Sequence, residues 1–507
     1  MRILLYLLIV VLLMSCGINK SSFSPNKKYS PQQLQKDYSI YETMLEESHP
    51  GLYWYTSKDS MDYYFRKGAE CLKDSLTEPE FRKVLSYVSA KINCGHTSVR
   101  SSKKFSNYFD TSRIKIFPLS IKVWEDPSAD NKIGDTMTVA ANLNRDDSIL
   151  KRGTIIKKIN DKPVEEIVDT LFSYISTDGY NRTHKFQSLS NRGYFGSLYT
   201  SIFGPYEKYK IEYLDSAGNP GTVLIPVYNP ATDTFFQNYI RPLSSIPHPS
   251  RRERKQRQIS SVRQLRIDSI QHTAFMELNS FGRGYHLKGF FRHSFRSLKK
   301  HKIGDFIIDV RGNGGGSISN STILSRYLTD HRFKIADSLY AIRKKNTYGR
   351  YIQNNFFNRL FISFFTKRSS DGYYHFGYFE RHFFNPKKKN HYRGNVYIII
   401  GGNSFSATTL FTSSIIKQDN VLVVGEETGG GAYGNNAWLI PDVTLPVTGV
   451  RFRLPLFRLV VDKNYPKTGK GVQPEVEVIP SVQAVRRSAD YKLDKVLEII
   501  KENKKKK

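Results

Sequence analysis

Two apolar runs of buried-strand length, far apart in the sequence, most constrain how this chain folds. Phe306–Val310 leads into a glycine-rich stretch that ends at Gly316, and Val396–Ile400 leads into the sequence NSFSATT. In both, β-branched residues give way to glycine and small polar residues, and a helical pattern follows. Strands that alternate with helices imply crossover connections and a largely parallel sheet. The sequence therefore predicts an α/β core over residues 274–490, within a multidomain α+β chain.

Further elements of this core follow from the apolar spacing. The predicted elements, in order, are strand 274–278, helix 290–300, strand 306–310, helix 321–328, strand 396–400, helix 407–416 and strand 421–424. Residues 340–392 interrupt the pattern with an aromatic and basic insertion. This insertion is interpreted as a packed lid or subdomain, with a ligand cage as the alternative.

Residues 31–113 read as a helical N-terminal domain. Pro31, directly after Ser30, is typical of the first position of a helix. Further helices are predicted over about 58–75 and 78–92, and the latter has a capping box in Thr77 and Glu80. The third helix ends in a glycine-containing turn, residues 93–97, that carries His96.

Residues 114–230 are rich in strand patterns. Residues 153–164, GTIIKKINDKPV, predict a strand, an Asn-Asp turn and a second strand that enters a helix. This stretch is interpreted as the core of a PDZ-like peptide-binding module, or else as a plain hairpin. Residues 231–273 are basic and polar and are expected to form a linker, and residues 491–507 a basic tail.

The first residues predict export from the cytoplasm. Residues 1–16 combine one arginine, an apolar run and Leu13-Met14-Ser15-Cys16, which resembles a bacterial lipoprotein signal with Cys16 as the lipidated residue. An uncleaved anchor helix is the alternative, and residues 17–30 form a polar tether in either case. The expected location is the cell envelope, on a lipid anchor. The remaining cysteines, Cys71 and Cys94, form either a disulfide or two free thiols.

The formal net charge is +31. Its bases are dispersed and accompany no nucleic-acid-binding motif, so no nucleic-acid partner is expected. The charge fits either anionic lipid or lipopolysaccharide, or an ordinary solvated surface. No cysteine or histidine spacing typical of a metal site is present, and neither metal nor cofactor is expected.

Ser406 occupies a position suited to nucleophilic chemistry. It falls where a predicted strand meets a predicted helix, a corner that exposes the serine and places free backbone N–H groups near its oxygen. A serine is a weak nucleophile without a neighbouring base. The pattern therefore points to acyl transfer and requires a base from elsewhere in the chain.

Seven motifs together resemble the tail-specific, or C-terminal-processing, serine peptidases, most of all their tricorn-core-like branch. They occur in the family's order across nearly the whole mature chain: HPGLYWY (49–55), CGHTSV (94–99), GTIIKKINDKPV (153–164), DVRGNGGG (309–316), NSFSATT (403–409), VGEETGG (424–430) and GKGVQPEVEV (469–478). The resemblance implies a crotonase-like ββα catalytic core, a PDZ-like module and no cofactor. It implies Ser406 as the nucleophile. The Ala407 N–H and a glycine N–H of residues 314–316, preferably Gly315, would form the oxyanion hole.

The base and its support depart in part from the family pattern. Where one branch of the family carries a lysine, this chain has Gly431, and no lysine lies between Lys417 and Asp462. The other branch uses a histidine in a turn that His96 matches, and histidine titrates near neutral pH. Asp462 is the nearest candidate for the acidic residue that orients the pair, and Gly95 stands where that branch has a serine.

The sequence thus predicts a serine endopeptidase that hydrolyses peptides or unfolded protein termini through Ser406 and His96, with Asp462 as the candidate orienting residue. The alternative is a catalytically inactive scaffold of the same fold that binds peptides or a lipophilic ligand in the envelope.

Overall fold

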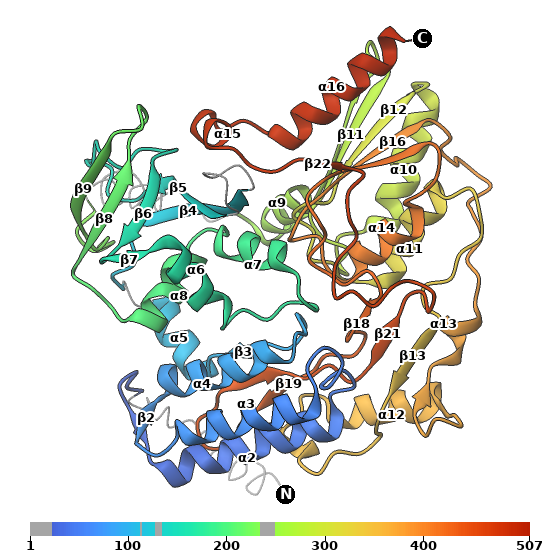
Figure 1. Ribbon diagram of the computed structural model, residues 1–507. Helices are drawn as coiled ribbons and strands as arrows, with labels where there is room; N and C mark the ends of the chain where they lie inside the picture. Colours follow the sequence, from blue (N-terminus) through green and yellow to red (C-terminus); the bar gives the residue numbers. More distant parts are fainter. Residues whose placement is uncertain (1–22, 112–113, 127–133, 234–248, 507) are drawn as a thin grey trace, which may run out of the picture.

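The computed structural model describes residues 23–111, 114–126, 134–233 and 249–506. The predicted signal peptide, Cys16 and the first part of the tether lie outside these residues. In Figure 1 the N-terminal helices form the lower part of the molecule, a β-rich module the left, and the α/β core the right. The arrangement is a mixed α/β multidomain fold, as predicted. No helix in the described ranges is long and apolar enough to cross a membrane.

The N-terminal part is helical, and its first three helices begin where the sequence predicted. Ser30 and Thr77 each complete a capping box, which satisfies free N–H groups in the first turn of their helices. The elements here are β1 (Lys28–Tyr29), α2 (Pro31–Ser48), α3 (Lys58–Glu70), β2 (Leu76–Thr77), α4 (Glu78–Lys91), β3 (Val99–Arg100) and α5 (Lys103–Thr111).

The second part is a β-rich module wrapped by short helices. The Asn160-Asp161 turn between β6 and β7 has φ values of 49° and 66°, which Asn and Asp tolerate better than most residues. The elements are β4 (Leu119–Asp126), β5 (Gly134–Asn142), β6 (Ile155–Ile159), β7 (Lys162–Pro163), α6 (Val164–Phe172), α7 (Arg182–Leu189), α8 (Tyr194–Phe203), β8 (Lys208–Leu214) and β9 (Pro220–Pro226). The predicted strand, turn and helix are present; the PDZ-like assignment stays a prediction.

The core is a six-stranded sheet in the order β10-β11-β12-β16-β17-β22, parallel throughout except for β10. Helices α10, α11 and α14 cover one face and α16 the other, so alternate residues of each strand enter separate apolar cores. The bounds are β10 (Arg263–Asp268), β11 (Thr273–Leu278), α10 (Leu287–Lys300), β12 (Asp305–Asp309), α11 (Ile318–Leu328), β16 (Asn395–Ile400), α14 (Ala407–Ile415), β17 (Val421–Gly425), β22 (Val476–Glu477) and α16 (Tyr491–Lys505).

Two segments predicted to lie outside the core are built into it. The second half of the basic linker forms α9 (Arg251–Val262) and then β10, because Val262 packs inward and β10 pairs with β11. The predicted basic tail is α16, whose apolar face buries Val496 and Ile500 against the sheet. In both segments the few apolar residues that pack inward are surrounded in the sequence by surface lysines and arginines.

Smaller sheets join the N-terminal part to the core. Strand β3, which directly follows the His96 turn, pairs with β20 through Val99 and Phe452. One apolar cluster contains residues of both parts, so they share a core. The remaining strands are β13 (Ser338–Ala341), β14 (Lys367–Arg368), β15 (Tyr374–His375), β18 (Gly434–Asn435), β19 (Asp442–Thr444), β20 (Arg451–Arg453) and β21 (Arg458–Val460).

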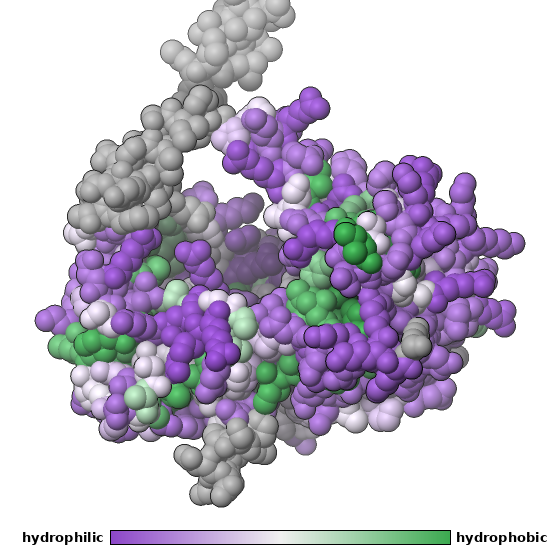
Figure 2. Space-filling model, turned by 90° about the horizontal axis from the view of Figure 1, so that it is seen from above, coloured by the Kyte–Doolittle hydropathy of each residue, from purple (hydrophilic) through white to green (hydrophobic). Residues whose placement is uncertain are grey.

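The aromatic insertion is a subdomain on this shared core. Ile362 and Phe376 are buried against the core, whereas Phe356, Phe357 and Phe364 are exposed. Its helical segments are η3 (Gly349–Tyr351), α12 (Asn355–Phe365) and α13 (Gly377–Arg381), and a further short helix, α15 (Val482–Arg487), precedes α16. Figure 2 shows that hydrophilic residues dominate the face seen from above, with hydrophobic residues gathered in small patches.

Candidate active site

Ser406 stands at the N-terminus of α14, between the end of β16 and the helix. Its backbone has φ 57° and ψ −119°, a conformation that non-glycine residues rarely adopt. Such strain persists only where the surrounding structure enforces it, and it is concentrated at functional sites. The side chain is half-buried and lines a cleft of about 1130 Å³. The predicted strand-to-helix corner is therefore present, with the serine turned into the cleft.

The glycine-rich loop after β12 lies directly against this serine. A Cβ atom on Gly315, where φ is +96°, would lie 2.8 Å from Ser406 Cβ and 2.9 Å from the Ala407 nitrogen. Only glycine allows this approach. The two sequence segments predicted to form one site are thus in contact.

The same loop determines which N–H groups can stabilise an oxyanion. The Gly315 N–H donates a 2.9 Å hydrogen bond to Asn313 Oδ1, so it is not free to bind an oxyanion. Gly316 lines the cleft beside Ser406, and within the described residues its N–H and that of Ala407 have no acceptor. The predicted Gly315 N–H is thus engaged, whereas the N–H groups of Gly316 and Ala407 are available beside Ser406.

His96 lies against the residue that precedes the serine. Its imidazole packs on the Phe405 ring with centroids 4.9 Å apart, and only 6% of the residue is exposed. The turn is held by the Thr97 N–H bond to the Cys94 carbonyl and by a 2.8 Å hydrogen bond between His49 Nε2 and Thr97 Oγ1. Folding thus brings the predicted base to the segment of the predicted nucleophile. The described residues show no hydrogen bond between His96 and Ser406.

The carboxylate beside His96 is Asp178, which sequence reasoning missed. Asp178 Oδ1 lies 4.0 Å from His96 Nδ1, and the carboxylate accepts the Gly95 N–H at 2.8 Å and the Gly431 N–H at 3.3 Å. Asp178 follows α6 in a loop of the β-rich module. Its only signal in the sequence is an Asp-Gly turn, which is common in loops.

Burial favours the neutral form of both groups and shifts the pKa of each accordingly. Desolvation lowers the pKa of His96 to about 3, with smaller contributions from the nearby Arg453, His184 and His49. Desolvation raises the pKa of the Asp178 carboxyl to about 7, against the two backbone N–H bonds that it accepts. A neutral imidazole is the form that accepts a proton from serine. Since Nδ1 faces Asp178, Nε2 is the nitrogen left for Ser406.

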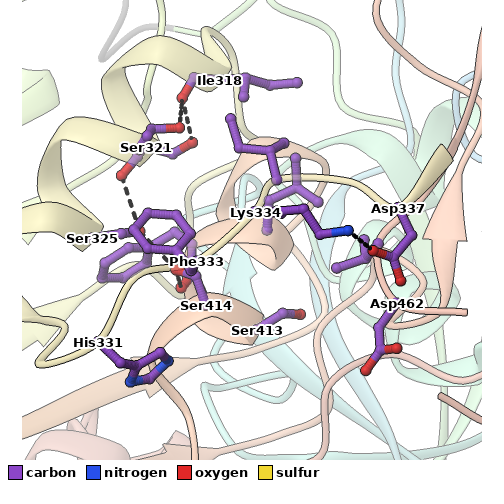
Figure 3. A pocket seen from close by; sticks show the side chains of 15 residues that line it. Ile318, Ser321, Ser325, His331, Phe333, Lys334, Asp337, Ser413, Ser414 and Asp462 are labelled. Atoms are coloured by element: carbon purple, nitrogen blue, oxygen red, sulfur yellow. Dashed lines mark hydrogen bonds and ion pairs between the residues drawn. The ribbon is translucent and has the colours of Figure 1, made fainter. Parts of the chain in front are cut away.

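Asp462 takes other partners. It is exposed, accepts the Asn464 N–H at 2.8 Å and lines a separate pocket of about 290 Å³ next to Asp337 (Figure 3). In the described residues it forms no ion pair with His96, whose acidic neighbour is Asp178. The structure therefore does not bring the candidate orienting residue to the histidine, because the loop after β21 places Asp462 in a pocket lined by α11 and α14.

Local packing accounts for the departure from the family pattern at Gly95. A Cβ on Gly95 would lie 2.4 Å from Phe405 Cζ, so the ring fills the space of a side chain at that position. At Gly431, where one branch carries a lysine, the backbone N–H instead holds Asp178. A second imidazole, His184, packs on Phe405 with centroids 5.0 Å apart.

Cys71 and Cys94 are both free thiols, Cys71 at the surface and Cys94 in the interior. Cys94, His96 and Asp178 are the one group in the described ranges whose side chains could jointly ligate a metal, with ligand atoms within 4.8 Å of one another. Metal binding there would withdraw the imidazole from Ser406. Outside this site, Arg311 binds Asp309 and Asp490, which fixes the loop after β12.

Comparison with known proteins identifies the class. Residues 272–478 match the model of peptidase family S41. The α/β core therefore belongs to this peptidase family, which confirms the predicted resemblance to tail-specific peptidases at the level of the family. The PDZ-like and crotonase-like assignments and the branch stay predictions.

Solved structures of CPAF share the fold over most of the chain. CPAF complexed with lactacystin is 15% identical, with a TM-score of 0.62 over 93% of this chain and 98% of that chain. A serine-to-alanine mutant of CPAF is 13% identical, with a TM-score of 0.63 over the same shares. A search of curated proteins finds no match.

Proposed function

We propose that the chain is a serine peptidase that hydrolyses peptides or unfolded protein termini at the cell envelope. Ser406 Oγ attacks the peptide carbonyl while His96 takes the hydroxyl proton and passes it to the leaving amine. Water, deprotonated by the same histidine, then releases the acyl group. The N–H groups of Gly316 and Ala407 stabilise the oxyanion in both steps, each such donor contributing about 3 kcal/mol.

The observation that carries this proposal is the backbone of Ser406. A strained serine, with φ 57°, lines a large cleft, contacts a glycine-rich loop and directly precedes the Ala407 N–H at a helix start. A serine with only a packing role has no need of that conformation. The family S41 match over the same residues supports the assignment.

Asp178 is proposed to orient His96. Its distance of 4.0 Å from Nδ1 exceeds that of a hydrogen bond, so a shift of about 1 Å is required to form one. Catalytic hydrogen bonds are often long before substrate binds. Once ionised and in contact, the carboxylate would raise the low pKa of His96 and strengthen it as a base.

The same distance favours the alternative of an inactive peptide-binding scaffold. Without a bond from His96 to Ser406 and to Asp178, an imidazole with a pKa of about 3 is a weak base. The two functions share the cleft and differ in whether Ser406 reacts.

A fluorophosphonate probe distinguishes them. Wild-type protein is expected to be labelled, Ser406→Ala to remain unlabelled, and Ser319→Ala to behave as wild type. Ser319 is an exposed serine of the same cleft and serves as the matched control. Folded wild-type protein that resists the probe and hydrolyses no peptide would establish the scaffold.

The envelope location is proposed from the sequence of residues 1–16 alone. Expression in a bacterium with an alkyne fatty acid is expected to label the protein, and Cys16→Ser to abolish that labelling. Retained labelling of Cys16→Ser, or none in wild type, would refute lipidation at this residue.

A further inference from the structure

The charged side chains that line the cleft of Ser406 are all basic. They come from four places: the loop after β11, the helices α10 and α11, and the end of the aromatic insertion. They are Arg283, Lys288, Arg292, Arg326 and Lys387. Among the described residues, no aspartate or glutamate lines the cleft. Apolar and aromatic side chains line it as well, with Trp438, Phe379 and Ile318 among them.

These charges lack acidic partners. The described residues include no carboxylate within 4.0 Å of any of the five. Arg326 donates Nε to the Asn385 carbonyl at 2.7 Å, which leaves its terminal N–H groups available. The pKa of Lys387 is lowered by burial and then by the nearby charges of Arg326 and Lys288. Like charges gathered in this way favour an anionic ligand.

The bases and Ser406 line one cleft, so a peptide bound at the serine would extend among them. Lys288 and Arg292 are four residues apart and share one side of α10. Along α11, Arg326 is eight residues beyond Ile318, or about 12 Å. An extended peptide covers about 3.3 Å per residue, so roughly four residues span that distance. Arg283 follows Gly282, whose nitrogen lies 2.5 Å from where a Gly316 Cβ would be, and so flanks the oxyanion loop.

We propose that this cleft selects peptides that carry acidic side chains within about four residues of the scissile bond. The inference rests on the proposed peptidase function and adds its substrate class. Aspartate or glutamate side chains would pair with Arg283, Lys288, Arg292 and Arg326, while apolar side chains pack on the aromatic residues of the cleft. Arg283, Lys288 and Arg292 are exposed and Arg326 is half-buried, so the attraction depends on several bases that act together rather than on one strong pair.

The test uses three fluorescein-labelled decapeptides that differ only at two positions, which carry Glu, Gln or Lys. Hydrolysis by the wild-type protein is followed by mass spectrometry, and binding is followed by fluorescence anisotropy on Ser406→Ala. The Glu peptide is expected to be hydrolysed at least tenfold faster, and bound at least tenfold more tightly, than the Lys peptide. The preference should shrink in 0.5 M salt, because ions screen exposed charges.

Charge reversal locates the effect. In the double variant Lys288→Glu/Arg292→Glu, the ratio of the rates for the Glu and Lys peptides is expected to fall at least tenfold. The double variant Lys299→Glu/Lys300→Glu makes the same change of net charge on the same helix but outside the cleft, and it should retain the preference for the Glu peptide. If the first variant does not fold, Arg326→Gln replaces it, with an expected loss of about threefold or more.

The outcomes separate the two proposals. Hydrolysis of all three peptides at equal rates overturns the acidic preference and keeps the peptidase. Preferred binding of the Glu peptide without hydrolysis by wild type keeps the preference and overturns the peptidase. Equal loss in the control variant would show a general charge effect and overturn the cleft assignment.

Discussion

Gly315→Ala should disable the site through geometry alone. The added Cβ would lie 2.7 Å from the Phe405 carbonyl oxygen and 2.8 Å from Ser406 Cβ, whereas ordinary contacts begin at 3.4 Å. The loop or the serine must therefore move by about 0.6 Å. Displacements approaching 1 Å cost about a hundredfold in rate, or about 2.7 kcal/mol of transition-state stabilisation. The positive φ adds a folding cost of about 1–2 kcal/mol.

The assay is the second-order rate of fluorophosphonate labelling, with thermal unfolding measured in parallel. Gly314→Ala is the matched control, because a Cβ at that neighbouring glycine meets nothing within 4 Å and its φ is ordinary. Gly315→Ala is expected to label about a hundredfold more slowly while it stays folded, and Gly314→Ala to label within twofold of wild type. Labelling of Gly315→Ala at the wild-type rate would refute the close contact between loop and serine, as would an equal loss in Gly314→Ala.

Four further predictions concern Asp178, His96 and Lys492. Burial raises the pKa of Asp178 to about 7 from 3.8, so labelling should fall as pH drops through 7, and Asp178→Asn should lack this step. Because the folded state binds this proton more tightly than the unfolded state, the contribution of Asp178 to the free energy of unfolding should fall by about 4 kcal/mol as the pH rises from 4 to 7. Urea unfolding of wild type and Asp178→Asn measures this contribution as the difference between the two proteins. A difference that stays constant with pH would contradict the prediction. His96→Ala should slow labelling at least a hundredfold and His184→Ala less than tenfold; equal rates for the two would remove His96 from the mechanism. Lys492→Ala breaks a buried ion pair with Glu426, at 2.6 Å, and should lower the free energy of unfolding by about 3–5 kcal/mol; an unchanged urea midpoint would refute a structural role for α16.

Local sequence signals gave the elements of the fold well. The starts of α2 and α4 were predictable because capping side chains act over three residues, and the core strands because they are continuous β-branched runs. The position of Ser406 followed from the same logic, since a strand end and a helix start are both visible in the sequence. Helix α16 was missed because lysines surround its apolar positions, and only the sheet it covers reveals its buried face.

The support of His96 depended on contacts that have no local signal. Asp178 is 82 residues beyond His96 and belongs to another module, so its approach to the His96 turn is set by the packing of whole modules. The place of Asp462 in the sequence predicts an orienting role, but in the structure this residue lines a different pocket. Asn313 likewise engages the Gly315 N–H, a choice between neighbouring glycines that only side-chain geometry reveals.

The two departures from the family pattern are matched to each other in space. Phe405 occupies the volume that a side chain at position 95 would need, and it supports the imidazole of His96. Gly431 stands where one branch of the family carries a lysine, and its backbone N–H holds the carboxylate that faces the same imidazole. Backbone strain such as that of Ser406 is concentrated at functional sites, and the packing on Phe405 keeps His96 beside the segment of this serine. These contacts support the proposal of a histidine-dependent peptidase over that of an inactive scaffold.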